Sequence, residues 1–414
     1  MNAPVPMEKV GPRRAAFGFV FVSAVTTAMS FGLMIPIMPA LLKQFTGGDT
    51  AQAAVWNTVF MTSGGLMSFF AGPVLGLFSD RFGRRPVLMV SLTGLGIDFL
   101  MMAFAPNLWW LFVGRLISGA TSGAFSTANA YVADVTAPEN RARAFGFMGS
   151  AFSFGFLAGP AVGGILGDAF GLRAPFIAAA CLTLVNVLYG AFVLPESLAP
   201  ERRAARFLWS KANPIGALNL LRSHHELLGL AGVYFLNQAS QAVWPAVFVL
   251  YTGYRYHWTP SLTGFYMMAG GVLGVAVQSF VVGPTVRRFG ERGTLLIGGT
   301  AAVFAFFWYG SAPTGWWYAA GMPISCLSGL VIPGLQGLMT RRVGSSEQGQ
   351  LQGANQSLMG LSGLVAPSLF GLSFAWAVDH PALGIPGLPL WIAGVCMTAA
   401  LALALKAAPR VSDA

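Results

Sequence analysis

Long apolar stretches alternate with short polar connections along the whole chain. A helix that crosses a bilayer needs about 20 predominantly apolar residues. These stretches are continuous runs without the alternation of a membrane β-barrel. The predicted spans cover residues 17–42, 52–78, 86–105, 108–134, 144–168, 174–194, 224–250, 261–286, 292–310, 315–340, 350–376 and 387–407. The pattern therefore predicts an all-α integral membrane protein with 12 transmembrane helices.

Composition supports placement in a lipid bilayer. Only 9% of the residues are charged, against about 25% in soluble domains. The 52 glycines and 25 prolines suit membrane helices that pack closely and bend. The three cysteines lie in predicted spans without metal-ligand or disulfide spacing. We expect no metal, no cofactor and no enzymatic activity, since no nucleophile–base set, nucleotide loop or metal cluster is present.

The positive charge is distributed by topology. If the N-terminus is cytoplasmic, 20 of the 24 Lys and Arg residues fall on the inner side of the membrane. The outer side receives only Lys43, Arg173 and Arg255. This asymmetry predicts an inner-membrane protein with both termini cytoplasmic, and no nucleic-acid partner. The first apolar stretch is long and contains Pro36 and Pro39, so we interpret it as a span and not as a signal peptide.

The chain repeats itself at an offset of 207 residues: Arg81-Phe82-Gly83 returns as Arg288-Phe289-Gly290, Trp109-Trp110 as Trp316-Trp317, Gly146 as Gly353 and Pro160 as Pro367. We infer two pseudo-symmetric six-helix halves, residues 1–194 and 224–414, joined by a cytoplasmic linker at 195–223. Substrate sites in such repeats lie near the midplane between the halves.

The halves differ in their intramembrane charges. The counterpart of Asp98 is Ala305, and that of Arg115 is Met322. Any ion coupling is therefore expected in the N-terminal half, with some of the substrate recognition opposite.

A charged segment at residues 76–86 interrupts the apolar pattern and is expected to form a short loop between two spans. Gly76 and Gly83 permit close approach and a tight turn. Its charged residues, which suit a gating role, are Asp80, Arg81, Arg84 and Arg85. Part of this basic charge also serves topology.

Three further ionisable residues are candidates for proton coupling. Asp98 lies deep in the third span, where a charge costs roughly 2.5–3.5 kcal/mol. Desolvation lets such a carboxylate bind and release protons, although a permanent ion pair is the alternative. Arg115, in the fourth span, would bias a neighbouring carboxylate or extend to the outer interface. Asp134 would join a salt-bridge network at an inner gate or cap a solvated helix end.

The charged segment, G-x-x-x-D-R-F-G-R-R, resembles the signature between helices 2 and 3 of major facilitator superfamily transporters. The closest likeness is to the twelve-helix tetracycline/proton antiporters, carried by residues 76–88, 114–119, 131–134, 144–148, 194–197, 244–251 and 349–353. This resemblance implies proton coupling through the Gly114-Arg115-x-x-x-Gly119 pattern. It also implies that Asp80 meets a helix N-terminus of the other half. The antiporter motif would comprise Gly155, Gly159, Pro160, Gly163 and Gly164.

The chain departs from these antiporters where they typically carry two further aspartates. Thr27 and Thr300 occupy those positions, and threonine cannot titrate or pair with a metal-chelated cationic substrate. The candidate cavity residues are Thr27, Asn57, Asn129, Gln238, Gln241, Gln278, Gln336 and Asn355, with Phe152 and Phe154. Bonding between neighbouring helices is the alternative role for each amide.

Three functions remain open at this stage. The first is a proton antiporter exporting a drug-like amphiphile, with tetracycline as one candidate. The second is a transporter of the same fold for another neutral or lipophilic metabolite, weakly coupled or uncoupled. The third is a membrane sensor that does not transport. The expected partners are a small-molecule substrate, protons and the bilayer, with the chain acting as a monomer.

Overall fold

The computed structural model describes residues 11–136, 140–203, 225–344 and 347–407. Most of the expected linker, residues 204–223, lies outside this part of the chain, as do Pro138 and Glu139 beside Asp134. Every regular element among the described residues is helical.

The first half contains α1 (Gly11–Met34), α2 (Met38–Phe45), α3 (Thr50–Phe82), α4 (Arg84–Phe104), α5 (Leu108–Ala120), α6 (Ala124–Val135), α7 (Arg141–Phe170) and α8 (Ala174–Val193). The 3-10 turn η2 (Pro200–Arg202) follows in the expected linker. The second half contains α10 (His225–Gln241), α11 (Val243–Tyr256), α12 (Pro260–Ala276), the π-helix η5 (Val277–Val281), α13 (Val282–Ser311), α14 (Gly315–Ala320), α15 (Met322–Leu327), η6 (Ser328–Leu330), α16 (Val331–Thr340), α17 (Gln348–Asp379), η7 (Pro381–Leu383) and α18 (Leu388–Ala407).

Nine segments of the described chain are long and apolar enough to cross a membrane. One of them, Pro260–Ser311, has 52 residues and is long enough for two crossings. Leu108–Ala120 is a shorter apolar helix within another predicted span. These observations confirm the all-helical membrane architecture and are consistent with twelve spans.

Several predicted spans are broken where continuous helices were expected. The first ends at Met34 and resumes at Met38, because Pro36 and Pro39 lack the amide hydrogens that a continuous helix needs. The span at 108–134 is interrupted at residues 121–123. The spans at 224–250 and 315–340 are likewise divided, beside Pro245 and between α14 and α16. Apolarity predicted the crossings but not these internal breaks.

The charged segment at residues 76–86 is helical except at Gly83, whereas the sequence predicted a loop there. Helix α3 continues through Asp80 and Arg81 to Phe82, and α4 begins at Arg84. Gly83 alone forms the connection, with φ at 109°, a left-handed value that suits glycine. The long charged side chains extend beyond the apolar layer from helical positions, so no extended loop is required.

The second half repeats this turn at Gly290, whose φ is 68° within α13. In both turns an arginine lies over the following phenylalanine ring: Arg81 over Phe82 at 5.5 Å and Arg288 over Phe289 at 5.4 Å. The 207-residue repeat is thus visible in the backbone. We call the end of the molecule that carries the two turns the loop end, and the opposite end the far end.

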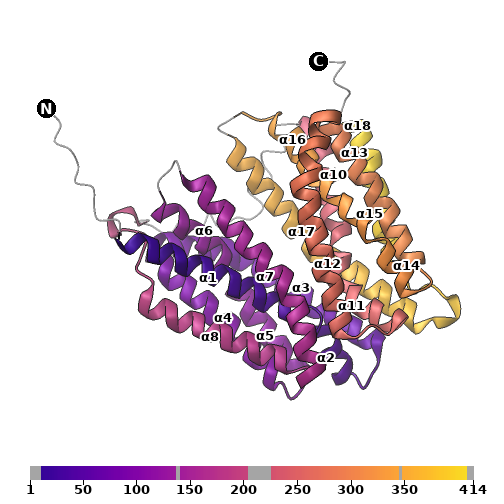
Figure 1. The fold of residues 1–414 in the computed structure, drawn as a ribbon, viewed down its shortest axis with the longest axis horizontal. Coiled ribbons are helices and arrows are strands. Elements are labelled where there is room, and N and C mark those ends of the chain that lie inside the picture. Colours follow the sequence, from indigo (N-terminus) through magenta and orange to yellow (C-terminus); the bar gives the residue numbers. More distant parts are fainter. Residues whose placement is uncertain (1–10, 137–139, 204–224, 345–346, 408–414) are drawn as a thin grey trace.

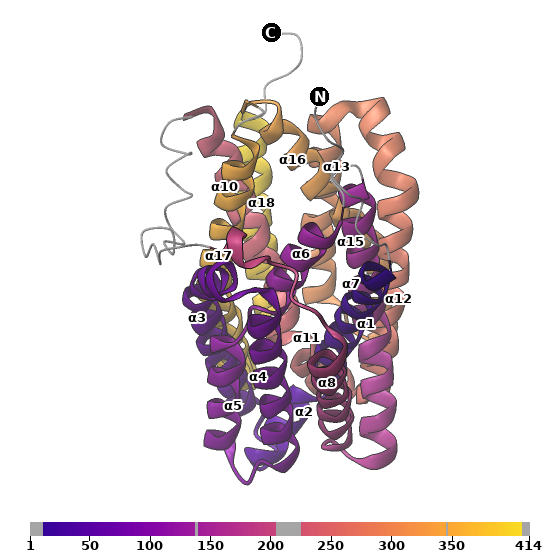
Figure 2. The same cartoon turned by 90° about the vertical axis from the view of Figure 1, so that its left-hand side faces the viewer.

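The two halves form separate bundles that meet towards the far end and diverge towards the loop end (Figure 1; Figure 2 shows the same bundles from the side). Helix α7 packs against α12, and α3 against α17. Hydrogen bonds join the halves from the Asn57 amide to the Ala246 carbonyl at 2.8 Å and between the Thr62 and Ser368 hydroxyls at 3.1 Å. At the far end, the Ser261 amide donates to the Asp168 carboxylate at 3.0 Å.

Candidate functional site

An ion pair within the N-terminal half joins two of the predicted coupling residues. Asp98 on α4 has no solvent exposure, and its two carboxylate oxygens meet the Arg115 guanidinium on α5. Arg115 Nε lies 3.3 Å from Asp98 Oδ1, and Nη2 meets Oδ2. The arginine side chain remains 13% exposed. The carboxylate is therefore reached through its arginine, which faces open space on its other side.

The glycines of the Gly114-Arg115-x-x-x-Gly119 pattern bring the ion pair together. A Cβ at Gly114 would lie 2.8 Å from Asp98 Oδ1, so a larger residue would push α5 away from α4. A Cβ at Gly119 would lie 2.8 Å from Met67 Cβ and 3.3 Å from Gly64 Cα on α3. Small residues allow such approaches between membrane helices. The pattern thus fixes α5 against two neighbours and aims Arg115 at Asp98.

Beside the ion pair lies a cavity of about 470 Å³. Apolar lining is supplied by Phe31, Phe60 and Phe152 together with methionine and leucine side chains. Its hydroxyls come from Ser23, Thr27, Ser68, Ser91, Ser118, Thr121 and Ser122. Arg115 is the only charged residue in the lining, and Pro245 is the only contribution of the second half among the described residues. Such a mostly apolar chamber with a few polar groups is typical of a small-molecule site.

The structure brings only some of the predicted cavity residues to this chamber. Thr27, Asn57 and Phe152 line it. The predicted residues outside its lining are Asn129, Phe154, Gln238, Gln241, Gln278, Gln336 and Asn355.

Two of these amides have other surroundings. Gln241, the last residue of α10, accepts a hydrogen bond at 3.0 Å from the indole of Trp244, near the start of α11. Asn355 is 2% exposed, and its amide has no protein hydrogen-bond partner among the described residues. The role of these residues in substrate contact stays a prediction.

The predicted antiporter motif makes α7 a close neighbour of helices from both halves. Cβ atoms at Gly159 and Gly163 would lie 2.7 Å from Gly32 Cα and 2.8 Å from Leu33 Cα, both in the α1 region. A Cβ at Gly164 would lie 2.7 Å from Ser261 Cα on α12 of the other half. Gly155 faces α1 in the same way, and Pro160 lies against α12. The motif therefore forms part of the contact between the halves.

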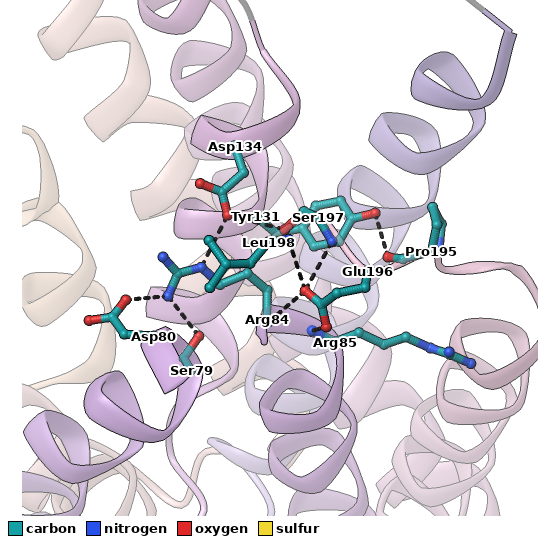
Figure 3. A network of polar contacts seen from close by, with 10 residues as sticks. All are labelled: Ser79, Asp80, Arg84, Arg85, Tyr131, Asp134, Pro195, Glu196, Ser197 and Leu198. Atoms are coloured by element: carbon teal, nitrogen blue, oxygen red, sulfur yellow. Dashed lines mark hydrogen bonds and ion pairs between the residues drawn. The ribbon is translucent and has the colours of Figure 1, made fainter. Parts of the chain in front are cut away.

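A second cluster surrounds Arg84 at the loop end (Figure 3). Its guanidinium donates from Nη1 to Asp80 Oδ1 at 2.6 Å and to the Ser79 hydroxyl at 3.0 Å. Its Nε donates to Asp134 Oδ2 at 3.1 Å, which also accepts from the Ser197 hydroxyl at 3.1 Å. We call these side chains, together with Glu196, the Arg84 network.

Glu196 is the charged member of this network that sequence reasoning missed as a site residue. Its Oε1 accepts from the backbone amides of Arg84 at 2.8 Å and of Ser197 and Leu198 at 3.0 Å, and its Oε2 from that of Arg85 at 3.2 Å. A carboxylate there satisfies the unpaired amides at the start of α4. The nearest signal in the sequence is an acid directly after Pro195, just past an apolar span.

The Arg84 network joins the N-terminal half to the start of the linker, where Glu196 and Ser197 lie. Asp80 is paired with Arg84 and is half exposed. Among the described residues this pair is its ion-pair contact, and its expected contact with a helix of the other half stays a prediction. Arg81 is exposed, while Arg85 donates to the Ala191 carbonyl at 2.6 Å. Asp134 belongs to this network and not to the Asp98–Arg115 pair. Its role in proton coupling and the gating role of Asp80 stay predictions.

No group of three or more His, Cys, Asp or Glu side chains in the described part of the chain is arranged to hold a metal ion. The cavity lining offers one cation, Arg115, and several hydroxyls for hydrogen bonding.

Comparisons with known proteins agree with this geometry. The family model of the Major Facilitator Superfamily matches residues 20–367. The chain is 38% identical to the class C tetracycline resistance protein of Escherichia coli over 81% of its length and 84% of that protein. It is 36% identical to the class G protein of Vibrio anguillarum, with 79% and 82% covered.

Among solved structures, the chain resembles a single-residue mutant of the nucleoside transporter NupG, with a TM-score of 0.75, 14% identity and coverage of 95% and 100%. It also resembles the human organic anion transporter MFSD10, with a TM-score of 0.65, 21% identity and coverage of 95% and 99%. At these identities the likeness concerns the fold alone. Taken with the family model that covers most of its length, the paired bundles identify the chain as a member of the Major Facilitator Superfamily.

Proposed function

We propose that the protein is a proton-coupled secondary transporter that exports a drug-like amphiphile by alternating access. The observation that carries this proposal is the Asp98–Arg115 pair on the wall of a mostly apolar cavity. A buried carboxylate beside an arginine has two states. When it is ionised it binds the arginine, and when it is protonated it releases the arginine. Family membership and the named tetracycline resistance relatives support the direction and the substrate class.

The proposed topology places the loop end and both termini in the cytoplasm, because most lysines and arginines then lie inside. The halves then meet on the outer side, at Asn57, Thr62 and Asp168. The structure corresponds, on this proposal, to an inward-open state that is ready to load substrate. One chain contains both bundles and the cavity, which supports a monomer as the working unit.

The coupling step is a proton transfer to Asp98. In the ionised state, Asp98 holds the Arg115 guanidinium through both oxygens. A proton arriving from the outer side at one of these oxygens removes the negative charge and weakens both hydrogen bonds. Arg115, which cannot give up its own proton, is then free to turn into the cavity. Movement of one charge through 100 mV supplies ~2.3 kcal/mol, enough for roughly a 50-fold substrate gradient.

The test is tetracycline uptake into inside-out membrane vesicles, with and without an imposed pH gradient. We expect gradient-driven uptake in the wild-type protein and none in Asp98→Asn. The matched control is Asp379→Asn, which removes an exposed carboxylate at the end of α17. Uptake that persists in Asp98→Asn would remove the carboxylate from the mechanism.

A second candidate is a transporter of another uncharged or lipophilic metabolite with weak proton coupling. It is favoured by Thr27 on the cavity wall and by Thr300, which is exposed and outside the lining. If this candidate holds, Thr27→Asp combined with Thr300→Asp leaves native transport no better. A gain in tetracycline export by the double variant would count against it.

A further inference from the structure

We infer that the substrate is uncharged where it meets Arg115: an aromatic amphiphile whose oxygens accept hydrogen bonds. This inference rests on the proposed proton antiport and narrows its substrate class. It follows from two exclusions, one based on the charges of the cavity wall and the other on the proton's effect on the ion pair.

The first exclusion concerns cations. Among the described residues no aspartate or glutamate lines the cavity, and Arg115 is its only charged residue. Asp98 is fully buried behind the arginine and both of its oxygens are engaged. An ammonium or a cationic chelate entering this space would lose hydration and gain no counter-ion. The wall is therefore unsuited to a cationic substrate.

The second exclusion concerns anions. Protonation of Asp98 leaves Arg115 as an uncompensated cation at the cavity wall, and an anionic substrate would bind better to that state. Proton and anion would then bind together and move in the same direction, because linkage between two ligands is reciprocal. Antiport requires the opposite, that proton binding disfavours the substrate. An anion is thus incompatible with exchange through this pair.

The linkage between proton and substrate binding depends on Asp98 and Arg115, because the helices packed against Asp98 bring no other charged side chain near it. Helix α5 carries no other charged residue than Arg115, and α8, which also packs against α4, carries none. The acids on α3 and α6, Asp80 and Asp134, are held by Arg84 at the loop end. A proton on Asp98 therefore acts on the cavity through Arg115.

An uncharged substrate satisfies both conditions. With Asp98 ionised, the ion pair at the cavity wall is electrically neutral, and the Arg115 edge and lining hydroxyls such as those of Thr27, Ser118 and Ser122 offer hydrogen bonds to acceptor oxygens. The rings of Phe31, Phe60 and Phe152 offer apolar faces for an aromatic body. After protonation, the released guanidinium turns into the space that the substrate would occupy. Proton and substrate then exclude one another.

The inference is tested with three 1,8-dihydroxyanthraquinones that differ in one substituent: aloe-emodin with a hydroxymethyl group, rhein with a carboxylate, and the aminomethyl analogue as a cation. Binding to the purified protein in lipid nanodiscs is measured by equilibrium dialysis at pH 6. We expect aloe-emodin to bind about tenfold more tightly than either charged analogue. In Asp98→Asn, which imitates the protonated state, rhein should become the tightest of the three, while Asp379→Asn keeps the wild-type order.

Tightest binding of the aminomethyl analogue to the wild-type protein would overturn the inference, and so would undetectable binding of all three. Rhein leading already in the wild-type protein would also overturn it. Uptake of the same dyes into inside-out vesicles separates this inference from the proposed function. Gradient-driven uptake of the cation would leave proton antiport standing and reject the substrate class. Binding of aloe-emodin without gradient-driven uptake would retain the class and reject antiport.

Discussion

The turns at Gly83 and Gly290 share one backbone design but differ in their ionic surroundings. Each has a glycine with positive φ, preceded by an arginine stacked on a phenylalanine. In the first half, Arg84 pairs with Asp134. At the same offset of 207 residues, the second half pairs Glu291 with Arg341. The ion pair is thus repeated with its charges exchanged.

The exchange of charges between the two ion pairs shows which features the turn itself requires. Backbone and stack are common to both halves, so either sign of charge is compatible with the turn. The supporting contacts differ, because Arg84 is largely buried within the Arg84 network, whereas Arg341 is 72% exposed. Glu196, whose carboxylate accepts from the Arg84 and Arg85 backbone amides of the first turn, has Leu403 as its counterpart. We therefore expect the first turn to move as a rigid unit and the second to adjust more easily.

The largest effect is expected from removing Arg84, the cation at the centre of the Arg84 network. Arg84→Ala leaves Asp134 and Asp80 without their partner, and we expect a loss of about 3 kcal/mol in the free energy of unfolding. Thermal unfolding in detergent measures this loss, with Arg341→Ala as the matched control in the other turn. Equal destabilisation by both variants would contradict the inferred difference in rigidity.

Alanine substitutions at Gly83 and Gly290 allow a direct comparison of the two turns. Alanine at either position is strained by the positive φ, at about 1 kcal/mol. At Gly83 the new Cβ would also meet the Glu196 carboxylate, whereas at Gly290 nothing lies within 4 Å. We expect Gly83→Ala to cost about 2 kcal/mol and Gly290→Ala about half as much. Unfolding curves that place Gly290→Ala below Gly83→Ala in stability would argue that Glu196 yields at little cost.

Exchanging the charges in the first turn tests whether sign matters there. Arg84→Glu with Asp134→Arg gives the first turn the polarity of the second. In the double variant Asp80 faces a like charge at position 84. We therefore expect the second substitution to recover about 1–2 kcal/mol, which is only part of the stability that Arg84→Glu loses alone. A double-mutant cycle reports this coupling energy, and full recovery would mean that Asp80 contributes nothing.

The smallest effect is expected for the Glu291–Arg341 pair. Glu291→Gln removes the partner of an arginine that is 72% exposed, so solvent screens the pair and we expect a change below about 1 kcal/mol. The same unfolding assay applies at low and high salt, where the wild-type advantage should shrink as salt screens the pair. A larger loss that salt does not reduce would place Glu291 in a buried network.

The sequence predicted the elements that depend on composition and regular spacing. Apolar runs located the crossings, and isolated charges in them located Asp98 and Arg115, since a buried charge needs a partner. Features that depend on three-dimensional packing were less accessible. The path of α3 through Asp80 and Arg81 to Phe82 depends on side chains reaching beyond the membrane layer. The role of Glu196 depends on the end of α8 returning beside the start of α4, which no local pattern encodes.

The cavity lining has a consequence for how substrate range can change. Among the described residues it is built almost entirely from the first half, with Pro245 as the exception. Substitutions between residues 23 and 152 can therefore alter recognition while leaving the second bundle untouched. Recombination that joins this first half to the second half of a relative should carry the substrate preference with it. Selectivity would then be inherited as a single genetic block.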